Sequence, residues 1–257
     1  MLLAVDVGNT QTHLGVWNGA DLRAEWRIST DARRTSDELA LALQEFLHFE
    51  GLSFSSQVSG VVLSSVVPSL TAAHREMVQR YFHFEPVVVE PGTRTGMPIV
   101  TDNPREVGAD RIVNAVAGFA LTGGPLVVID FGTATTFDAV SEAGEYLGGA
   151  IAPGVQISAN ALASTAAQIQ KVELVQPRNV IGRSTVESLR SGVLLGAAAM
   201  VDGMVERMQK ELGGSAALVA TGGLAPLVLE QCSVTVRHEP SLTLTGLRII
   251  YERNAAR

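Results

Sequence analysis

The chain opens with Met1-Leu2-Leu3-Ala4-Val5-Asp6-Val7-Gly8-Asn9-Thr10, an apolar run that ends in a short polar turn. Alternating residues resume over 12–17, so the pattern predicts a strand, a tight turn and a second strand. In such a turn Asp6 can orient water on a magnesium ion, and Gly8 lets backbone N–H groups approach anionic oxygens. Taken alone, the stretch is more simply explained as an ordinary hairpin turn, because turns favour Asp, Asn and Gly.

The same pattern returns in the second half of the chain. The apolar run 126–129 leads into Asp130-Phe131-Gly132-Thr133-Ala134-Thr135-Thr136, and further strands are predicted over 137–140 and 146–151. Asp6 and Asp130 are 124 residues apart in a chain of 257, which is near half its length. This spacing predicts an internal duplication, and two matched Asp turns are poorly explained by coincidence.

The remaining periodic segments predict an α/β fold. Strands alternate with helices after each hairpin, which is typical of mixed sheets with helices on their faces. The further predicted strands are 22–28, 60–63, 86–90, 217–220 and a short one near Val234. The predicted helices are 36–48, 69–82, one that follows Arg111 and ends near Leu121, one that follows Pro153-Gly154 and ends near Ala166, 185–210, a short one after Gly223 and a last one after Leu242. The breaker Thr122-Gly123-Gly124-Pro125 suggests two domains, 1–118 and 119–257.

Bulk composition narrows the class of protein. Hydrophobic residues make up 46% and charged residues 18%, which is enough for a core and argues against global disorder. The net charge of −7 argues against nucleic acid as the main partner. No apolar run approaches the ~18 residues that span a bilayer, so no membrane partner is expected. The single Cys232 excludes an intrachain disulfide and is compatible with a cytoplasmic location.

An ordered set of motifs gives the chain a family resemblance. Between the two Asp turns stand Ser64-Ser65-Val66-Val67-Pro68 and the run from Asn103 through Gly108-Ala109-Asp110-Arg111, and after them come Gly148–Gly154 and Thr221-Gly222-Gly223. Over nearly its whole length the chain resembles the type III pantothenate kinases of the acetate kinase, sugar kinase and actin superfamily. The resemblance implies two duplicated ribonuclease H-like (actin-like) α/β domains, whose mixed sheets are flanked by helices and whose hairpins hold the phosphates of ATP.

The resemblance also implies a reaction, the transfer of the ATP γ-phosphoryl group to the primary hydroxyl of pantothenate, which gives 4'-phosphopantothenate and begins coenzyme A biosynthesis. It makes Asp110 the catalytic base and places Gly108, Ala109, Arg111 and Thr185 against pantothenate, with Arg111 suited to its carboxylate. Each residue has a plainer alternative: Asp110 favours a helix N-terminus, Arg111 forms a surface ion pair, and Thr185 caps a helix.

The cofactor residues implied by the resemblance lie in the two turns. ATP would be bound by Asp6, Val7, Gly8, Asn9, Thr10, Gln11, Thr12, His13, Gly132 and Thr133. Asp6 would act on magnesium through water, and Asp130 would hold a monovalent cation, potassium or ammonium. The family further implies a homodimer, for which the long helix 185–210 is the expected contact.

One departure and two rival functions remain open. Many family members carry Tyr two residues before the Asn-Pro of the loop 91–104, where it lines the pantothenate pocket, whereas this chain has Thr101. Affinity for pantothenate is therefore in doubt. The rivals are another small-molecule (sugar or acid) kinase of the same fold, and a non-catalytic regulatory relative, because fold alone allows all three.

Overall fold

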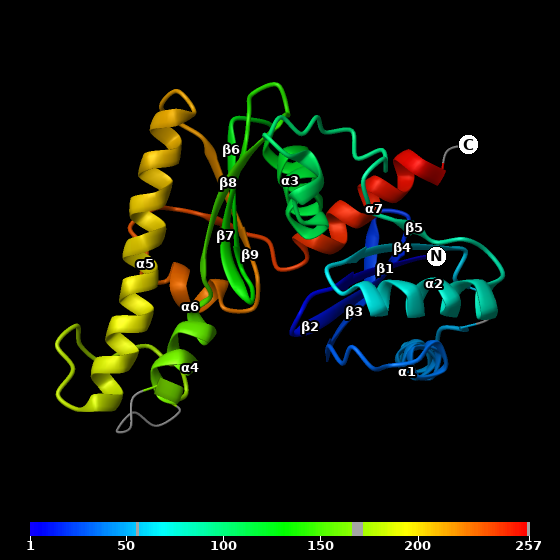
Figure 1. Cartoon of the computed structure of the whole chain (residues 1–257), viewed down its shortest axis with the longest axis horizontal. Coiled ribbons are helices and arrows are strands. Elements are labelled where there is room, and N and C mark those ends of the chain that lie inside the picture. The colour runs from blue at the N-terminus through cyan, green and yellow to red at the C-terminus, as the bar shows by residue number, and fades with distance from the viewer. Residues whose placement is uncertain (55–56, 166–171, 256–257) are drawn as a thin grey trace. The chain divides into compact units, whose positions relative to one another are not determined.

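The computed structural model describes residues 1–54, 57–165 and 172–255 (Figure 1). Contacts divide the chain into two compact units, each of which is described by itself. Unit 1 comprises Met1–Met97, Asn103–Ala117 and Leu242–Arg257, and unit 2 comprises Pro98–Asp102 and Gly118–Ser241. The domain limits 1–118 and 119–257 stay a prediction.

Unit 1 is built on a mixed five-stranded sheet of order β3-β2-β1-β4-β5. Its strands are β1 (Leu2–Val7), β2 (Gln11–Asn18), β3 (Asp21–Ser29), β4 (Gly60–Ser65) and β5 (Val87–Val88). β1 pairs antiparallel with β2 and parallel with β4, so the N-terminal strand occupies the centre of the sheet. The helices are α1 (Ser36–Phe49), α2 (Pro68–Phe82), the 3-10 turn η1 (Pro104–Glu106), the first part of α3 (Ala109–Thr122) and α7 (Leu242–Ala255).

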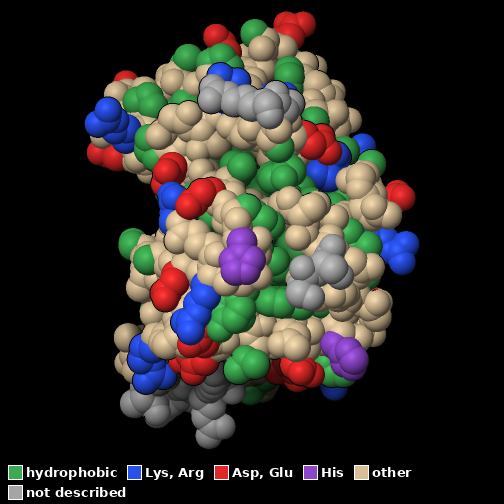
Figure 2. All heavy atoms as spheres, turned by 90° about the vertical axis from the view of Figure 1, so that its right-hand side faces the viewer, with side chains coloured by type: hydrophobic (Ala, Val, Ile, Leu, Met, Phe, Trp, Pro, Cys, Tyr) green, Lys and Arg blue, Asp and Glu red, His purple; other side chains and the backbone are tan. Residues whose placement is uncertain are grey.

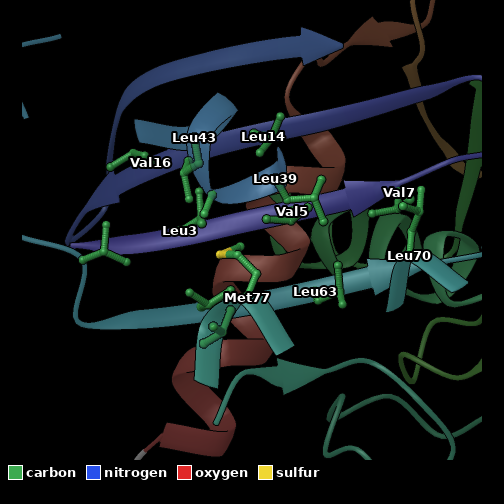
Figure 3. Close-up of a cluster of buried hydrophobic side chains, with 14 of the residues drawn as sticks. Leu3, Val5, Val7, Leu14, Val16, Leu39, Leu43, Leu63, Leu70 and Met77 are labelled. Carbon is green, nitrogen blue, oxygen red and sulfur yellow. The ribbon is translucent and has the colours of Figure 1, made fainter. Parts of the chain in front are cut away.

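The alternation of β1 sorts its side chains between two layers. Leu3, Val5 and Val7 are buried with α1 and α2, and Figure 3 shows them converging with side chains such as Leu43 and Met77 of these helices. The intervening residues point to the opposite face, where α7 packs on β1, β2 and β4. Asp6 therefore lies on the face that α7 covers.

The local helix signals hold in unit 1. Thr35 and Glu38 form the reciprocal capping box that begins α1, and Pro68 occupies the first turn of α2. α3 and α7 pack closely, because Gly246 lies against the backbone of Val113. The hydroxyl of Thr243 donates to Asn114 Oδ1 at 2.7 Å across the same contact.

Unit 2 repeats this connectivity in a sheet of order β10-β9-β6-β7-β8. Its strands are β6 (Leu126–Phe131), β7 (Ala134–Val140), β8 (Tyr146–Pro153), β9 (Ala217–Thr221) and β10 (Arg237–His238), and its helices are α4 (Val155–Thr165), α5 (Thr185–Glu211) and α6 (Ala225–Leu229). As in unit 1, the central strand β6 pairs antiparallel with the next strand and parallel with a later one. The expectation of an α/β fold with two mixed sheets flanked by helices is confirmed.

Some predicted elements differ in extent. The short strand expected near Val234 is present three residues further along the chain, at Arg237–His238, while Val234 itself is partly buried against the core of unit 2. Its apolar character reflects packing and not strand pairing. β5 has two residues, Val87–Val88, instead of the predicted 86–90. The predicted end of the helix at Ala166 lies outside the described residues.

α5 is long and apolar enough to cross a membrane by length and composition alone, although the sequence has no uninterrupted apolar run of that length. Of its most apolar 18-residue window, 44% is buried. The buried side chains of α5 belong to the core of unit 2, where they meet Val127, Ile129 and Phe131 of β6. A core helix passes the same length and composition test, so this feature is weak evidence for a membrane span.

Candidate functional site

The first hairpin turn joins β1 to β2 and leaves Asn9 and Thr10 exposed at its tip. The N–H of Gly8 donates to the carbonyl of Gln11 at 3.0 Å and closes the turn. A Cβ on Gly8 would lie 3.0 Å from the same oxygen, which explains why glycine suits this position. The backbone is thus held tightly at the point where we expect it to meet phosphate.

Asp6 lies in a row of polar residues that crosses the sheet of unit 1. Its antiparallel neighbour on β2 is His13, and its parallel neighbour on β4 is Ser64. Ser64 is fully buried, and its hydroxyl has no hydrogen-bond partner among the described residues. A half-buried carboxylate beside such a hydroxyl fits a hydrated magnesium ion, which prefers oxygen ligands and retains water.

Within this row of residues, the protonation state of His13 is set by its surroundings. Burial, and then the neighbouring Arg27, lower the pKa of His13 to about 4, while Glu25 opposes this shift through a 3.1 Å contact with Nε2. His13 is therefore neutral at pH 7 and adds no positive charge to the turn. The prediction that His13 contacts ATP therefore depends only on its position in the strand that follows the turn.

The segment Gly108-Ala109-Asp110-Arg111 begins α3 in unit 1. Oδ1 of Asp110 accepts a hydrogen bond from the N–H of Arg111 at 2.9 Å and lies 2.5 Å from where a Cβ of Gly108 would be. Gly108 therefore makes room for this half-buried carboxylate. One carboxylate oxygen is held by the N–H of Arg111, and the other makes no hydrogen bond to a described residue, which is an arrangement in which a carboxylate can accept a proton.

The second hairpin turn joins β6 to β7 in unit 2. Asp130 has Thr136 as its antiparallel neighbour and Thr221 as its parallel neighbour, so its surroundings match those of Asp6 in register. Gly132 and Thr133 are exposed at the tip. Carboxylate and hydroxyl oxygens fit a hard monovalent cation.

Two glycines pack against this second turn. Gly154 lies so close to the carbonyl oxygens of Gly132 and Thr133 that a Cβ there would overlap them. Gly222 has φ +97°, and a Cβ on it would lie 2.6 Å from the backbone carbonyl of Phe131. Backbone packing therefore fixes the turn, which explains two glycines of the quoted motifs.

A buried polar cluster in unit 2 was missed from the sequence. Asp138 is fully buried and accepts hydrogen bonds from the hydroxyls of Tyr146 at 2.7 Å and Thr136 at 3.1 Å. Thr136 is also the cross-strand neighbour of Asp130. A charged residue inside the apolar strand Phe137–Val140 was the available signal.

Two further residues, Thr185 and Thr101, lie outside the two hairpin turns. Ser184, not Thr185, caps α5, because its Oγ accepts from the N–H of Glu187 at 3.2 Å. The alternative in which Thr185 is the cap is therefore wrong, and Thr185 is exposed in the first turn. α5 covers the face of the sheet opposite to Asp130. Thr101 belongs to unit 2, and its hydroxyl is buried without a hydrogen-bond partner among the described residues.

Unit 1 thus contains the first turn, Asp6 and the Gly108–Arg111 segment, and unit 2 contains Asp130, Gly132, Thr133 and Thr185. In unit 1 Asp6 lies under the face that α7 covers, and α3 packs on α7. Figure 2 shows positive and negative side chains interspersed over the face that it presents.

Solved structures define the class of fold. A Baf-family protein from Campylobacter jejuni aligns over 99% of this chain and 100% of its own, with a TM-score of 0.61 at 19% identity. A ROK hexokinase from Thermus thermophilus aligns over 99% of this chain and 98% of its own, with a TM-score of 0.51 at 14% identity. At these identities the likeness concerns the fold alone. Two such sheets with paired Asp turns define the actin-like class of ATPases and sugar kinases.

Sequence comparisons are more specific. The family model for type III pantothenate kinase matches residues 2–207. The type III pantothenate kinase of Streptomyces griseus is 54% identical over 264 aligned positions that cover 100% of both chains. That of Moorella thermoacetica is 52% identical over 254 positions, covering 99% of this chain and 100% of its own. The chain belongs to the type III pantothenate kinase family.

Proposed function

We propose that this protein transfers the γ-phosphoryl group of ATP to the primary hydroxyl of pantothenate and so begins coenzyme A biosynthesis. The observation that carries the proposal is the relation to type III pantothenate kinases at about half identity along the whole chain. ATP and magnesium follow as the donor and its metal. The reaction is proposed to take place in the cytoplasm, and fractionation of cells with the protein in the membrane pellet would contradict that.

The residues of unit 1 supply the chemistry in this proposal. Asp110 accepts the proton of the substrate hydroxyl through the oxygen that Arg111 N–H does not hold. The guanidinium of Arg111 pairs with the pantothenate carboxylate, and the N–H groups of Gly108 and Ala109 contact the substrate. Asp6 orients magnesium-bound water, because a carboxylate at a strand end beside a buried hydroxyl offers oxygens at the phosphates.

The two turns supply the donors for the phosphates. In the first, residues 6–13 surround the phosphates through backbone N–H groups and the exposed Thr10 hydroxyl, while the buried hydroxyl of Thr12 supports the turn from within the unit. In the second, Gly132 and Thr133 contact the nucleotide, and Asp130 holds a monovalent cation. The cation assignment is tested by replacing potassium with sodium, which should lower the rate in the parent and make little difference in Asp130→Asn. An equal rate of the parent in both salts would rule it out.

A homodimer is part of the proposal. A groove of about 480 Å³ runs between α4 and α5, lined by apolar side chains such as Val155, Leu162 and Val193. Ile157 and Leu162 on α4 are also about 45% exposed, so a second copy covering them would bury apolar surface. In this assembly Thr185, which is exposed in the first turn of α5, contacts the pantothenate bound by the partner subunit. A monomeric mass in sedimentation would contradict this assembly.

The decisive experiment is a substrate panel scored by ADP release and product mass, with ATP, magnesium and potassium present. Pantothenate should be phosphorylated, and Asp110→Asn should lower kcat about 100-fold or more. Asp21→Asn, which neutralises one exposed carboxylate of the same unit, serves as the control and should be unchanged. Phosphorylation of hexoses or acetate instead would support another kinase of this fold, and no ATP use at all would support a non-catalytic regulatory relative.

A further inference from the structure

We propose that Thr30 is a positioning residue that fixes the backbone of the first phosphate turn for ATP. The inference rests on the proposed function, because it concerns the same nucleotide site. Thr30 follows β3 and lies 22 residues from Gly8, yet it makes three hydrogen bonds to the segment Gly8–Thr12. No motif of the sequence includes it.

The three bonds form one connected set. The Thr30 hydroxyl donates to the carbonyl of Gly8 at 2.8 Å, and the Thr30 N–H donates to the carbonyl of Thr10 at 2.9 Å. The hydroxyls of Thr12 and Thr30 are 3.0 Å apart. Because a hydroxyl has one proton, and that of Thr30 is directed at Gly8, Thr12 is the donor in this pair. Thr12 is 3% exposed and Thr30 is half-buried, so the Thr12 side of the pair is shielded from water.

These hydrogen bonds set the orientation of the peptide group between Gly8 and Asn9. In a trans peptide the C=O and the N–H point in opposite directions, so a Gly8 carbonyl directed at Thr30 turns the N–H of Asn9 to the other side. The same bond keeps the carbonyl oxygen of Gly8, a partial negative charge, away from an anionic ligand. Asn9 is exposed at the tip of the turn, and we infer that its N–H, on the side away from Thr30, can be reached by a phosphate. Without the hydroxyl of Thr30 the carbonyl of Gly8 loses this hydrogen bond, and the orientation of the peptide between Gly8 and Asn9 is less firmly fixed.

The prediction is therefore specific to the nucleotide. Thr30→Val keeps the shape and the backbone N–H but removes the hydroxyl, and Thr30→Ser restores the hydroxyl. Thr71→Val is the matched control, because Thr71 in the same unit also donates one hydroxyl bond, to the Val67 carbonyl at 3.2 Å, away from the turn. The measurements are Kd for ATP without catalysis, KM for ATP and for pantothenate, kcat, and Tm.

Thr30→Val should raise Kd and KM for ATP on the order of 3- to 10-fold, the loss of one or two partly buried hydrogen bonds. KM for pantothenate should stay within about 2-fold, and Thr30→Ser should return the ATP constants to near those of the parent. Thr71→Val loses one hydroxyl bond, so it should lower Tm by no more than Thr30→Val does and leave the ATP constants unchanged. Thr30→Ala carries the same prediction should the valine variant not fold.

Unchanged ATP constants in Thr30→Val, an equal rise in both KM values, or no rescue by serine would overturn the role of Thr30. The parent protein separates this outcome from a failure of the proposed function. If the parent binds ATP but does not phosphorylate pantothenate, the proposed function is contradicted. The Kd for ATP, which is measured without catalysis, still tests the role of Thr30. A parent that does not bind ATP removes both.

Discussion

The two phosphate turns share a register but are supported in different ways. Asp6 and Asp130 occupy equivalent positions, each between an antiparallel and a parallel neighbour strand. The first turn is held by two hydrogen bonds from Thr30, whose hydroxyl donates to the carbonyl of Gly8 and whose backbone N–H donates to the carbonyl of Thr10. The second is held by contact with the backbone of glycines, Gly154 and Gly222.

The difference predicts how each turn tolerates change. A lost hydrogen bond costs about 1 kcal/mol and leaves the chain path intact, so the first turn should respond mainly in ligand affinity. A side chain forced between two backbones has no flexible partner that can move aside, so the second turn should respond in stability. The duplication has kept the Asp positions while the supporting contacts diverged.

The largest effect is expected for Gly222→Ala. The residue has φ +97°, and its Cβ would lie 2.6 Å from the carbonyl carbon and oxygen of Phe131. Left-handed backbone costs about 1–2 kcal/mol and overpacking about 1–3 kcal/mol, so unit 2 should lose roughly 3 kcal/mol or more. Urea unfolding followed by hydrogen exchange at β6 measures the loss.

The neighbouring Gly223 supplies the control. A Cβ on Gly223 meets nothing within 4 Å, so Gly223→Ala should leave the urea midpoint nearly unchanged. Equal stability of the two alanine variants would show that backbone packing does not support the second turn. The contrast between the turns would then be lost.

The parts of the site that could be predicted from the sequence are those with local signals. The pairing of Asp6 with Asp130 follows from two apolar strands that each end in a Gly-Thr turn, and the shared register agrees with it. Thr30 could not be predicted, because its partners are fixed by the alignment of β3 with β2 and not by neighbouring residues. The fold class was predictable for the same reason as the turns.

Short elements were the least predictable part of the fold. Arg237–His238 carry no strand pattern of their own, and pairing with Val219 and Ala220 of β9 makes them a strand. Val234 has the apolar pattern but packs in the core instead. Tertiary contacts override local preference at such positions.

The next effect concerns acid and should appear in unit 1. Burial lowers the pKa of His74, and burial and Arg27 lower that of His13 to about 4, so the unfolded chain takes up protons first as the pH falls below 6.5. Stability should then be constant above pH 7 and fall between about 6.5 and 4. His13 alone accounts for up to roughly 3 kcal/mol of this fall.

Tryptophan fluorescence measures this in unit 1 alone, because both tryptophans, Trp17 and Trp26, lie there. His74→Leu should flatten the decline of the urea midpoint between pH 6.5 and 5. His48→Asn, at an exposed position of α1, should leave the slope as in the parent. An unchanged slope in His74→Leu would contradict the assignment.

The smallest effect is expected for a buried Tyr–Asp hydrogen bond beside the second turn, compared with an exposed Tyr–Asp hydrogen bond in unit 1. Tyr146 donates to the buried Asp138 at 2.7 Å, and Tyr81 donates to the exposed Asp37 at the same distance. Tyr146→Phe removes a donor from a carboxylate that water cannot reach, at a cost of about 2 kcal/mol. In Tyr81→Phe water replaces the lost hydroxyl, so the urea midpoint should change little.

The pair also tests whether the buried cluster serves the turn. Asp138 holds the hydroxyl of Thr136, the cross-strand neighbour of Asp130, so Tyr146→Phe should alter the potassium dependence of the rate as well as stability. Tyr81→Phe should alter neither. Stability loss with an unchanged potassium dependence would restrict Asp138 and Tyr146 to the core, and equal stability of both variants would remove the distinction between buried and exposed support.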